Sequence, residues 1–309
     1  MQEMTKERIQ IYARAFRVNQ WIKNLVIFTA IIFSGKLFDS GLLSKTIYGF
    51  FVFCLLSSTS YILNDIIDYH YDRKHPVKKH RPIASGKITI AEATFTVFVM
   101  TFFSLIVSLF FSIPFFLLAL VFILLHFFYS LYLKKHPIID IFAISFSFML
   151  RTFAGEVVTG FHIPSWLLLT IFFISLFMAT VKRHAELRRQ GQGTRESLYH
   201  YKSHFLDFLT YTFAASTFIA YAMYTYIEKP PTTPSFFSDP LHDWFPNFEA
   251  KRWLMITVPL VVYGIARYAQ LLYEREEGEA PERIITSDIP LMATIFLWGA
   301  IVIGLIYVL

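Results

Sequence analysis

The chain alternates long apolar stretches with short polar ones along nearly its whole length. A helix that crosses the hydrocarbon core of a bilayer needs about 20 mainly apolar residues, and we find nine candidates. Their approximate positions are 22–38, 46–64, 90–110, 114–133, 138–158, 164–181, 205–227, 252–273 and 289–309. Because only a helix satisfies every backbone hydrogen bond within one segment in lipid, the pattern predicts an all-α bundle of about nine transmembrane helices.

The composition also indicates an integral membrane protein. Hydrophobic residues make up 55% of the 309 positions and charged residues only 16%, whereas soluble domains carry about 25% charged residues. We expect a single transmembrane domain over residues 1–309, in which residues 1–20 form an amphipathic N-terminal segment without the features of a signal peptide. The single cysteine, Cys54, lies in an apolar stretch, which argues against a disulfide framework or a thiolate metal site.

Basic residues are concentrated in alternate connecting segments. Of the 28 Lys and Arg residues, 22 fall in the N-terminal segment and the even-numbered loops, five fall on the other side, and Arg151 lies inside a predicted helix. Loops rich in Lys and Arg stay on the cytoplasmic side, so we expect a multi-pass protein of the cell (inner) membrane with a cytoplasmic N-terminus. The net charge of +6 suits contact with anionic lipid headgroups or phosphorylated substrates.

The polar stretch from Asn64 to Lys87 begins with an acidic motif. Asn64, Asp65, Asp68 and Asp72 are spaced so that a continuous helix would place them on or beside one face. Mg²⁺ prefers oxygen ligands and is commonly shared between carboxylates and substrate phosphates. The spacing therefore favours an Mg²⁺–diphosphate site, with a hydrated helix end whose acids pair with nearby bases as the alternative.

Basic residues follow this motif directly, and Lys78 and Arg81 are candidates for binding phosphate oxygens. A guanidinium offers two parallel donors to a phosphate, and an ammonium offers a compact charge. A positive-inside loop would explain many of these bases, but it does not explain the aspartates. The combination of acids and bases indicates a binding site on the predicted cytoplasmic side.

Arg151 lies at membrane depth in the predicted helix 138–158. An Arg at the centre of a spanning helix costs at least about 2.5 kcal/mol on insertion scales, so it should face a partner or a wet cavity. It either binds a phosphate or ribose hydroxyls, or it pairs with an acid on another helix. The sequence leaves both alternatives open.

The motif N-D-x-x-D-x-x-x-D, formed by Asn64, Asp65, Asp68 and Asp72, resembles the first aspartate-rich signature of the UbiA superfamily of intramembrane prenyltransferases. Its continuation, DRKHPVKKHRPIASG, is similar to D-x-x-H-P-x-K-x-x-R-P-I-A-x-G of the decaprenyl-phosphate phosphoribosyltransferase branch. Further stretches that resemble this branch are Arg17–Asn24, Tyr129–Ile141, Phe148–Gly155, Lys182–Leu187, Thr194–Leu198 and Arg267–Tyr268. The resemblance covers nearly the whole chain.

The resemblance implies a nine-helix bundle whose polar cavity faces the cytoplasm, with Mg²⁺ as the cofactor. It implies catalytic roles for Asp65, Asp68 and Asp72, which with Asn64 would also be the metal ligands. Substrate-binding roles are implied for Lys23, Asn64, Lys78, Arg81, Tyr129, Lys134, Arg151, Lys182, Arg183 and Glu186. For Tyr129 and Lys134 the plainer alternative is an interfacial residue at the end of a helix.

One departure separates this chain from the aromatic prenyltransferases of the superfamily, which carry a second aspartate-rich motif after the sixth helix. Here the segment from Lys182 to Lys202 contains only Glu186 and Glu196 as carboxylates, among many bases. We expect this segment to contact an anion directly rather than through a metal. That arrangement suits a lipid monophosphate acceptor beside one Mg²⁺–diphosphate donor.

The resemblance therefore implies transfer of a 5-phosphoribosyl group from phosphoribosyl diphosphate to a polyprenyl phosphate of the decaprenyl type, as a step in cell-wall biosynthesis. The alternative within the superfamily is transfer of a prenyl group from a prenyl diphosphate to an aromatic or other acceptor. An ion-coupled transporter is disfavoured, because most acids lie at predicted cytoplasmic helix ends beside bases. The expected partners are the two substrates and the lipid bilayer. The loops lack the elements of a nucleic-acid module, so we expect no nucleic-acid partner. The sequence leaves open whether the protein forms a homo-oligomer.

Overall fold

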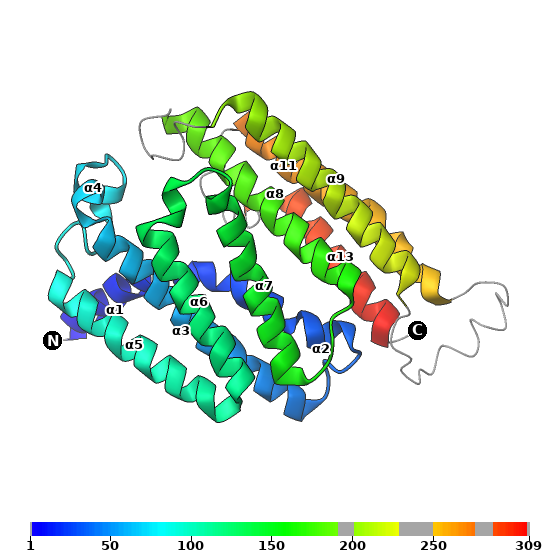
Figure 1. Cartoon of the computed structure of the whole chain (residues 1–309), viewed down its shortest axis with the longest axis horizontal. Helices are drawn as coiled ribbons and strands as arrows, with labels where there is room; N and C mark the ends of the chain where they lie inside the picture. The colour runs from blue at the N-terminus through cyan, green and yellow to red at the C-terminus, as the bar shows by residue number, and fades with distance from the viewer. Residues whose placement is uncertain (1, 191–200, 229–249, 276–286, 308–309) are drawn as a thin grey trace.

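The computed structural model describes residues 2–190, 201–228, 250–275 and 287–307, and within these residues the chain is a bundle of helices without strands (Figure 1). The helices are α1 (Gln2–Phe16), η1 (Val18–Phe28), α2 (Thr29–Phe33), α3 (Ser40–Ile67), α4 (Tyr69–Lys74), η2 (Lys78–His80), α5 (Ile90–Phe111), α6 (Ile113–Leu131), η3 (Leu133–Lys135), α7 (Ile139–Thr159), α8 (Ser165–Gln190), α9 (Ser203–Ile227), η6 (Ala250–Thr257), α11 (Val258–Arg275) and α13 (Ile289–Tyr307). The labels η mark 3₁₀ helices.

The apolar segments of the sequence are helical wherever the structure describes them, which confirms the predicted all-α class. Seven described helices are long and apolar enough to cross a membrane: α3, α5, α6, α7, α8, the stretch Trp253–Leu271 and α13. α9 is 25 residues long but carries more polar residues, among them His204 and Asp207. These helices make the chain a multi-pass membrane protein.

Two of the predicted segments differ from the helices that form. Segment 22–38 is divided between η1 and the five-residue α2, so the first span is not one regular helix. Segment 164–181 is extended, because α8 continues to Gln190. The extension carries Arg183, whose Nε lies 2.7 Å from Asp140 Oδ2 of α7 in a fully buried ion pair. A tertiary contact therefore keeps residues helical that the apolar pattern assigned to a loop.

Helix ends follow local capping chemistry. α5 begins with a capping box, in which Glu92 N donates to Thr89 Oγ1 at 3.2 Å and Thr89 N donates to Glu92 Oε2 at 2.9 Å. α6 begins after Ser112, whose hydroxyl accepts from Phe115 N at 3.2 Å, and Pro114 occupies its first turn. These capping residues determine where α5 and α6 begin, and they can be identified in the sequence.

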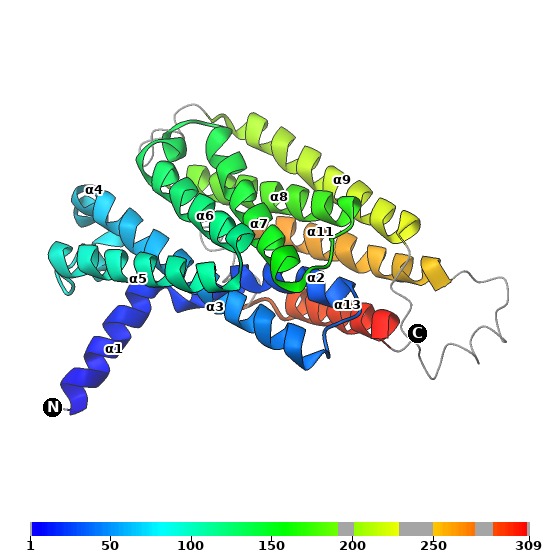
Figure 2. The same ribbon diagram turned by 60° about the horizontal axis from the view of Figure 1, so that its bottom comes forward.

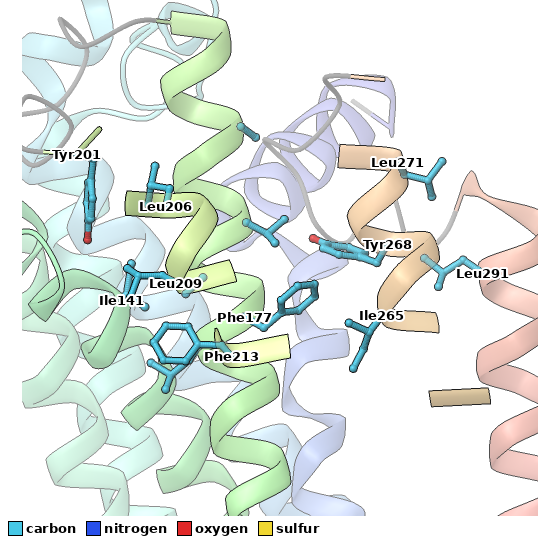
Figure 3. Packing of buried hydrophobic residues seen from close by; sticks show 14 residues of the cluster. Ile141, Phe177, Tyr201, Leu206, Leu209, Phe213, Ile265, Tyr268, Leu271 and Leu291 are labelled. Carbon is cyan, nitrogen blue, oxygen red and sulfur yellow. The ribbon is translucent and has the colours of Figure 1, made fainter. Parts of the chain in front are cut away.

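The bundle has two groups of helices that meet along its middle. α3, α5, α6 and α7 pack together with η1 around Phe53, Phe115 and Phe122, while α8, α9, α11 and α13 form the other group (Figure 1). Figure 3 shows the largest apolar cluster, in which Phe177, Phe213 and Tyr268 join α8, α9 and α11. Figure 2 shows α1 projecting away from both groups at the N-terminal end.

Gly155 lies where the backbones of α7 and η1 approach each other closely. A Cβ atom added there would lie 2.2 Å from the carbonyl oxygen of Ile27, so only glycine lets α7 pack this closely against η1. The same contact holds Asn24 of η1 near Arg151 of α7, where Nε of Arg151 donates to Asn24 Oδ1 at 2.6 Å. The position of the first helix relative to the cavity therefore depends on this glycine.

We predict that Gly155→Ala destabilises the protein, because the added methyl group forces η1 away from α7. Overpacking of this kind costs about 1–3 kcal/mol, which should lower the midpoint of thermal unfolding in detergent. Gly299→Ala on α13 is the matched control, because a Cβ there meets nothing within 4 Å. Equal unfolding midpoints for the two variants would contradict the close approach at Gly155.

Candidate active site

A cavity of about 920 Å³ lies between the two helix groups. One wall is polar and comes from η1, α3, the loop around η2, α6 and α7, together with the end of α8. The polar residues that line it are Arg17, Gln20, Lys23, Ser60, Tyr61, Asn64, Asp68, His75, Lys78, Arg81, His126, Tyr129, Ser130, Ser147, Arg151, Lys182 and Glu186. The opposite wall is mainly apolar and includes Leu167, Ile171, Ile174, Phe177, Leu260, Val261, Ile265, Leu291, Ile295 and Trp298, with the hydroxyl-bearing residues Thr170, Ser175, Thr217, Tyr221, Tyr268 and Thr294 among them. One cavity thus brings charged groups and an apolar surface together.

The acidic motif spans two helices instead of one. α3 ends at Ile67, and Asp68 (φ −86°, ψ 6°) joins it to the short α4. The backbone bonds from Asp68 N to Asn64 O and from Asp72 N to Asp68 O continue across this joint, both at 2.9 Å. Asp65 and Asp72 both contact Arg81, whereas Asp68 contacts Lys134, so the three carboxylates of the motif do not share a single partner.

Asp65 and Asp72 are buried and share one arginine. Nη1 of Arg81 lies 2.9 Å from Asp65 Oδ1 and 2.7 Å from Asp72 Oδ2. Asp65 Oδ1 also accepts from Nη2 of Arg17 at 2.6 Å, and the guanidinium of Arg17 lies over the ring of Tyr61. Neither aspartate lines the cavity. Asp65 holds Arg17 and Arg81 in place and Asp72 holds Arg81, and those two arginines do line the cavity.

Asp68 is the aspartate that faces the cavity. Its side chain is 25% exposed, against 4% for Asp65 and 5% for Asp72. Its Oδ1 lies 2.5 Å from Nζ of Lys134, and its Oδ2 accepts from Asn64 Nδ2 at 3.1 Å. Lys134 also donates to Asn64 Oδ1 at 3.3 Å, from a buried position in η3 behind the cavity wall. These contacts hold the oxygen atoms of Asn64 and Asp68 at the cavity surface.

The donor set at this surface fits a divalent cation. Oxygen atoms of Asn64 and Asp68 converge on the Lys134 ammonium, and Mg²⁺, which prefers oxygen ligands, would have to displace that ammonium to bind them. Asp65 and Asp72 fit less well, because they are buried and share Arg81. Within the described part of the chain, no three His, Cys, Asp or Glu side chains form a ligand group alone. A metal ion at this position would therefore complete its shell with water and substrate phosphates.

Arg151 is a buried cation whose hydrogen-bond partners among the described residues are all neutral. Besides Asn24 Oδ1, its guanidinium donates to the carbonyl and hydroxyl of Ser147 at 2.8 and 3.0 Å and to Ser57 Oγ at 3.3 Å. It also lies over the ring of Phe122, 4.5 Å from the centroid. Among the described residues, no acid on another helix pairs with Arg151, so the second alternative left open by the sequence is not observed. A buried positive charge without a negative partner favours a bound anion.

Arg183 lies behind the cavity and links three helices. It ion-pairs with Asp140 and Glu186, and its Nη2 donates to the hydroxyl of Tyr129 at 3.0 Å. Tyr129 and Glu186 line the cavity, whereas Arg183 does not. Arg183, predicted to bind substrate, therefore reaches the cavity only through these two neighbours.

Tyr201 contacts Asp140, the carboxylate that also pairs with Arg183. Burial, and then the nearby Asp140 carboxylate, raise the pKa of its hydroxyl, so Tyr201 stays protonated and donates to Asp140 Oδ1 at 2.8 Å. The hydroxyl also accepts from Ile138 N, at a residue with a φ of 68°. Arg17 (φ 49°) is the other non-glycine residue with positive φ in the described chain. Such backbone strain is typical of functional sites; Arg17 lines the cavity, whereas Ile138 does not.

Nine of the thirteen predicted site residues line the cavity: Lys23, Asn64, Asp68, Lys78, Arg81, Tyr129, Arg151, Lys182 and Glu186. The other four, Asp65, Asp72, Lys134 and Arg183, lie behind it. The similar stretch Thr194–Leu198 lies outside the described residues. The sequence interpretation missed Ser60, Tyr61 and His126, which also line the cavity. An ionisable residue inside the apolar α6 was a signal for His126, whose Nε2 has no hydrogen-bond partner among the described residues.

Comparisons with known proteins identify the family. The UbiA prenyltransferase family matches residues 25–298. A decaprenyl-phosphate phosphoribosyltransferase of Mycolicibacterium smegmatis is 31% identical over 95% of this chain and 92% of its own length. One of Corynebacterium glutamicum is 30% identical over 96% and 86%.

The fold agrees as well. The structure of a UbiA homolog from Archaeoglobus fulgidus bound to GPP and Mg²⁺ superposes with a TM-score of 0.71, at 19% identity, over 96% of this chain and 99% of that one. The family resemblance deduced from the acidic motif is confirmed by these matches, which extend over nearly the entire sequence. The chain belongs to the UbiA prenyltransferase family.

Proposed function

We propose that the protein transfers a 5-phosphoribosyl group from phosphoribosyl diphosphate to a polyprenyl phosphate and releases diphosphate. The observation that carries the proposal is the cavity itself, which joins a polar wall of cations to an apolar wall. A water-soluble, multiply charged donor and a lipid acceptor need these two surfaces side by side. The names of the two relatives that are similar over most of the chain support the same reaction.

The donor would bind along the polar wall. Lys78 and Arg81 supply positive charge to the diphosphate, and the Asp65 and Asp72 carboxylates hold the Arg81 guanidinium in position. Asn64 and Asp68 would hold Mg²⁺ against the diphosphate. When bound, the ion would neutralise charge that develops on the diphosphate as it leaves.

Arg151 would bind the phosphoribosyl part of the donor. Its neutral partners leave its charge uncompensated, and a ribose 5-phosphate supplies both a negative charge and hydroxyl groups. A prenyl chain against the same wall would instead leave the Arg151 charge beside hydrocarbon, which is unfavourable. The polar wall thus favours phosphoribosyl diphosphate over a prenyl diphosphate as the donor.

The acceptor would lie against the apolar wall, with its phosphate beside Lys182 at the end of α8. One phosphate oxygen attacks the anomeric carbon of the ribose, a new C–O bond forms, and the bond from that carbon to diphosphate breaks. The acceptor phosphate is already anionic near neutral pH, so no strong general base is required. Alignment of the two substrates in one cavity would supply much of the acceleration.

The orientation in the membrane follows from the same charges. The loop around η2 carries Lys78, Lys79 and Arg81, and the end of α8 carries Lys182, Arg183 and Arg188. Segments rich in Lys and Arg stay in the cytoplasm, where phosphoribosyl diphosphate would be the available donor. We therefore propose that the polar mouth of the cavity opens to the cytoplasm.

We predict that the purified protein with Mg²⁺ moves label from ribose-labelled phosphoribosyl diphosphate into a lipid extract when polyprenyl phosphate is present. The matched reaction contains a prenyl diphosphate and an aromatic acid in place of these substrates and should give no product. Product in the second reaction, with label left in the aqueous phase of the first, would reject the proposed reaction in favour of prenyl transfer.

We predict that Asp68→Asn and Asp65→Asn have different consequences. Asp68→Asn should abolish transfer and lower the unfolding midpoint less than Asp65→Asn does, because Asp68 is 25% exposed and pairs with Lys134 alone, whereas Asp65 is 4% exposed and pairs with two arginines. Asp65→Asn removes the buried partner of Arg17 and Arg81, and breaking such a pair costs about 3–5 kcal/mol. Its unfolding midpoint should therefore fall together with its activity. Full activity of Asp68→Asn would remove the basis of the proposed metal site.

We predict that Arg151→Gln raises the KM for phosphoribosyl diphosphate by about 10- to 100-fold, the effect of losing one hydrogen bond to a charged group. Its unfolding midpoint should also fall, because the variant loses buried hydrogen bonds to Asn24, Ser147 and Ser57, so the KM is the readout that reports on the ligand. Arg188→Gln is the control, since Arg188 contacts Tyr273 outside the cavity. A lowered unfolding midpoint with an unchanged KM would identify Arg151 as purely structural.

A further inference from the structure

His75 connects the acidic motif to the basic loop and lines the cavity. It ends α4, where its backbone N–H donates to Asp72 O at 3.2 Å. Its extended backbone (φ −81°, ψ 134°) is what a residue before a proline adopts, and Pro76 follows it. The backbone of His75 is therefore set by its neighbours at the point where the chain turns from Asp72 toward Lys78.

The imidazole of His75 has a defined tautomer. Its Nδ1 accepts from the backbone N–H groups of Val77 and Lys78, at 3.2 and 3.3 Å. Pro76 has no N–H, so these are the first two donors that the chain offers after the histidine. A ring nitrogen that accepts hydrogen bonds carries no proton, so the proton of the neutral ring lies on Nε2.

The Nε2 edge of the ring is the edge available to a ligand. Nδ1 is occupied by the loop backbone, so Nε2 is the ring nitrogen left for a ligand in the cavity that His75 lines. Lys78 and Arg81, which follow in the same turn, line the cavity too. His75 thus presents one fixed, neutral donor beside two cations.

We propose that His75 is a substrate-binding residue whose Nε2–H donates a hydrogen bond to an oxygen of the diphosphate group. This inference rests on the proposed function, which places a diphosphate against Lys78 and Arg81. The bond would strengthen as negative charge accumulates on the departing diphosphate, which is how a fixed donor assists group transfer. Because Nδ1 is occupied by the backbone, His75 supplies a hydrogen bond and does not act as a base.

The two ring nitrogens allow a test that separates ligand binding from loop structure. His75→Asn keeps an acceptor near the position of Nδ1 but has no donor near the position of Nε2. His75→Gln has the opposite properties, because its amide NH₂ reaches the position of Nε2. His80→Asn is the control, since His80 is exposed in the same turn and lies outside the cavity.

The measurement is the affinity of the full-length protein in detergent for inorganic diphosphate with Mg²⁺, by calorimetry. His75→Asn should bind about 10- to 100-fold more weakly than wild type, the effect of losing a hydrogen bond to a charged group, with an unchanged unfolding midpoint. His75→Gln should keep most of the affinity but unfold at a lower temperature, and His80→Asn should match wild type. Wild-type affinity in His75→Asn would overturn the proposal, as would equal losses in the Asn and Gln variants.

A second measurement does not depend on the fold of either variant. In wild-type protein labelled with ¹⁵N-histidine, one Nε2–H resonance should shift on addition of diphosphate, and no shift in any histidine would overturn the proposal. Diphosphate binding is separate from ribosyl transfer, so the two proposals can fail independently. Diphosphate binding through His75 without any phosphoribosyl transfer would reject only the reaction. Transfer with undiminished diphosphate binding in His75→Asn would reject only the role of His75.

Discussion

The site depends on one buried carboxylate, Asp65, which lies between two arginines from distant parts of the chain. Arg17 lies between α1 and η1, and Arg81 follows η2 in the basic loop; both contact Asp65 Oδ1. Charges buried in a protein surrounded by lipid are tolerated only in pairs or networks. This carboxylate therefore fixes the N-terminal segment and the loop relative to α3, and the remaining polar groups are positioned from there.

The same principle orders the polar wall in two layers. Residues behind the wall, such as Asp72, Lys134 and Arg183, form ion pairs with one another or with residues at its surface. Residues at the surface, such as Asp68 and Arg81, keep a side available to the cavity. An arrangement of this kind holds reacting groups without a cost of reorganisation, which is the main source of electrostatic catalysis.

Arg151 departs from this pattern, because its buried charge is surrounded by amide, hydroxyl and aromatic groups. Gly155, one turn further along α7, permits the close approach of η1 that brings Asn24 to the guanidinium. The packing thus supplies dipoles in place of a carboxylate. The positive charge of Arg151 is therefore available to an anionic ligand at a depth in the membrane where water is scarce.

The sequence by itself determined the class of fold and the location of the site. Hydrophobic segments, capping residues such as Thr89, and the spacing of the aspartates are local signals, and each is decided within a few turns of the chain. The tertiary structure alone decided which charges pair, which face the cavity and where a helix is interrupted. Asp65 and Asp68 are three residues apart and look equivalent in the motif, yet one is buried between arginines and the other faces the cavity. Burial and pairing depend on which helix packs against a residue, and a contact such as Lys134 with Asp68 joins positions that no local pattern relates.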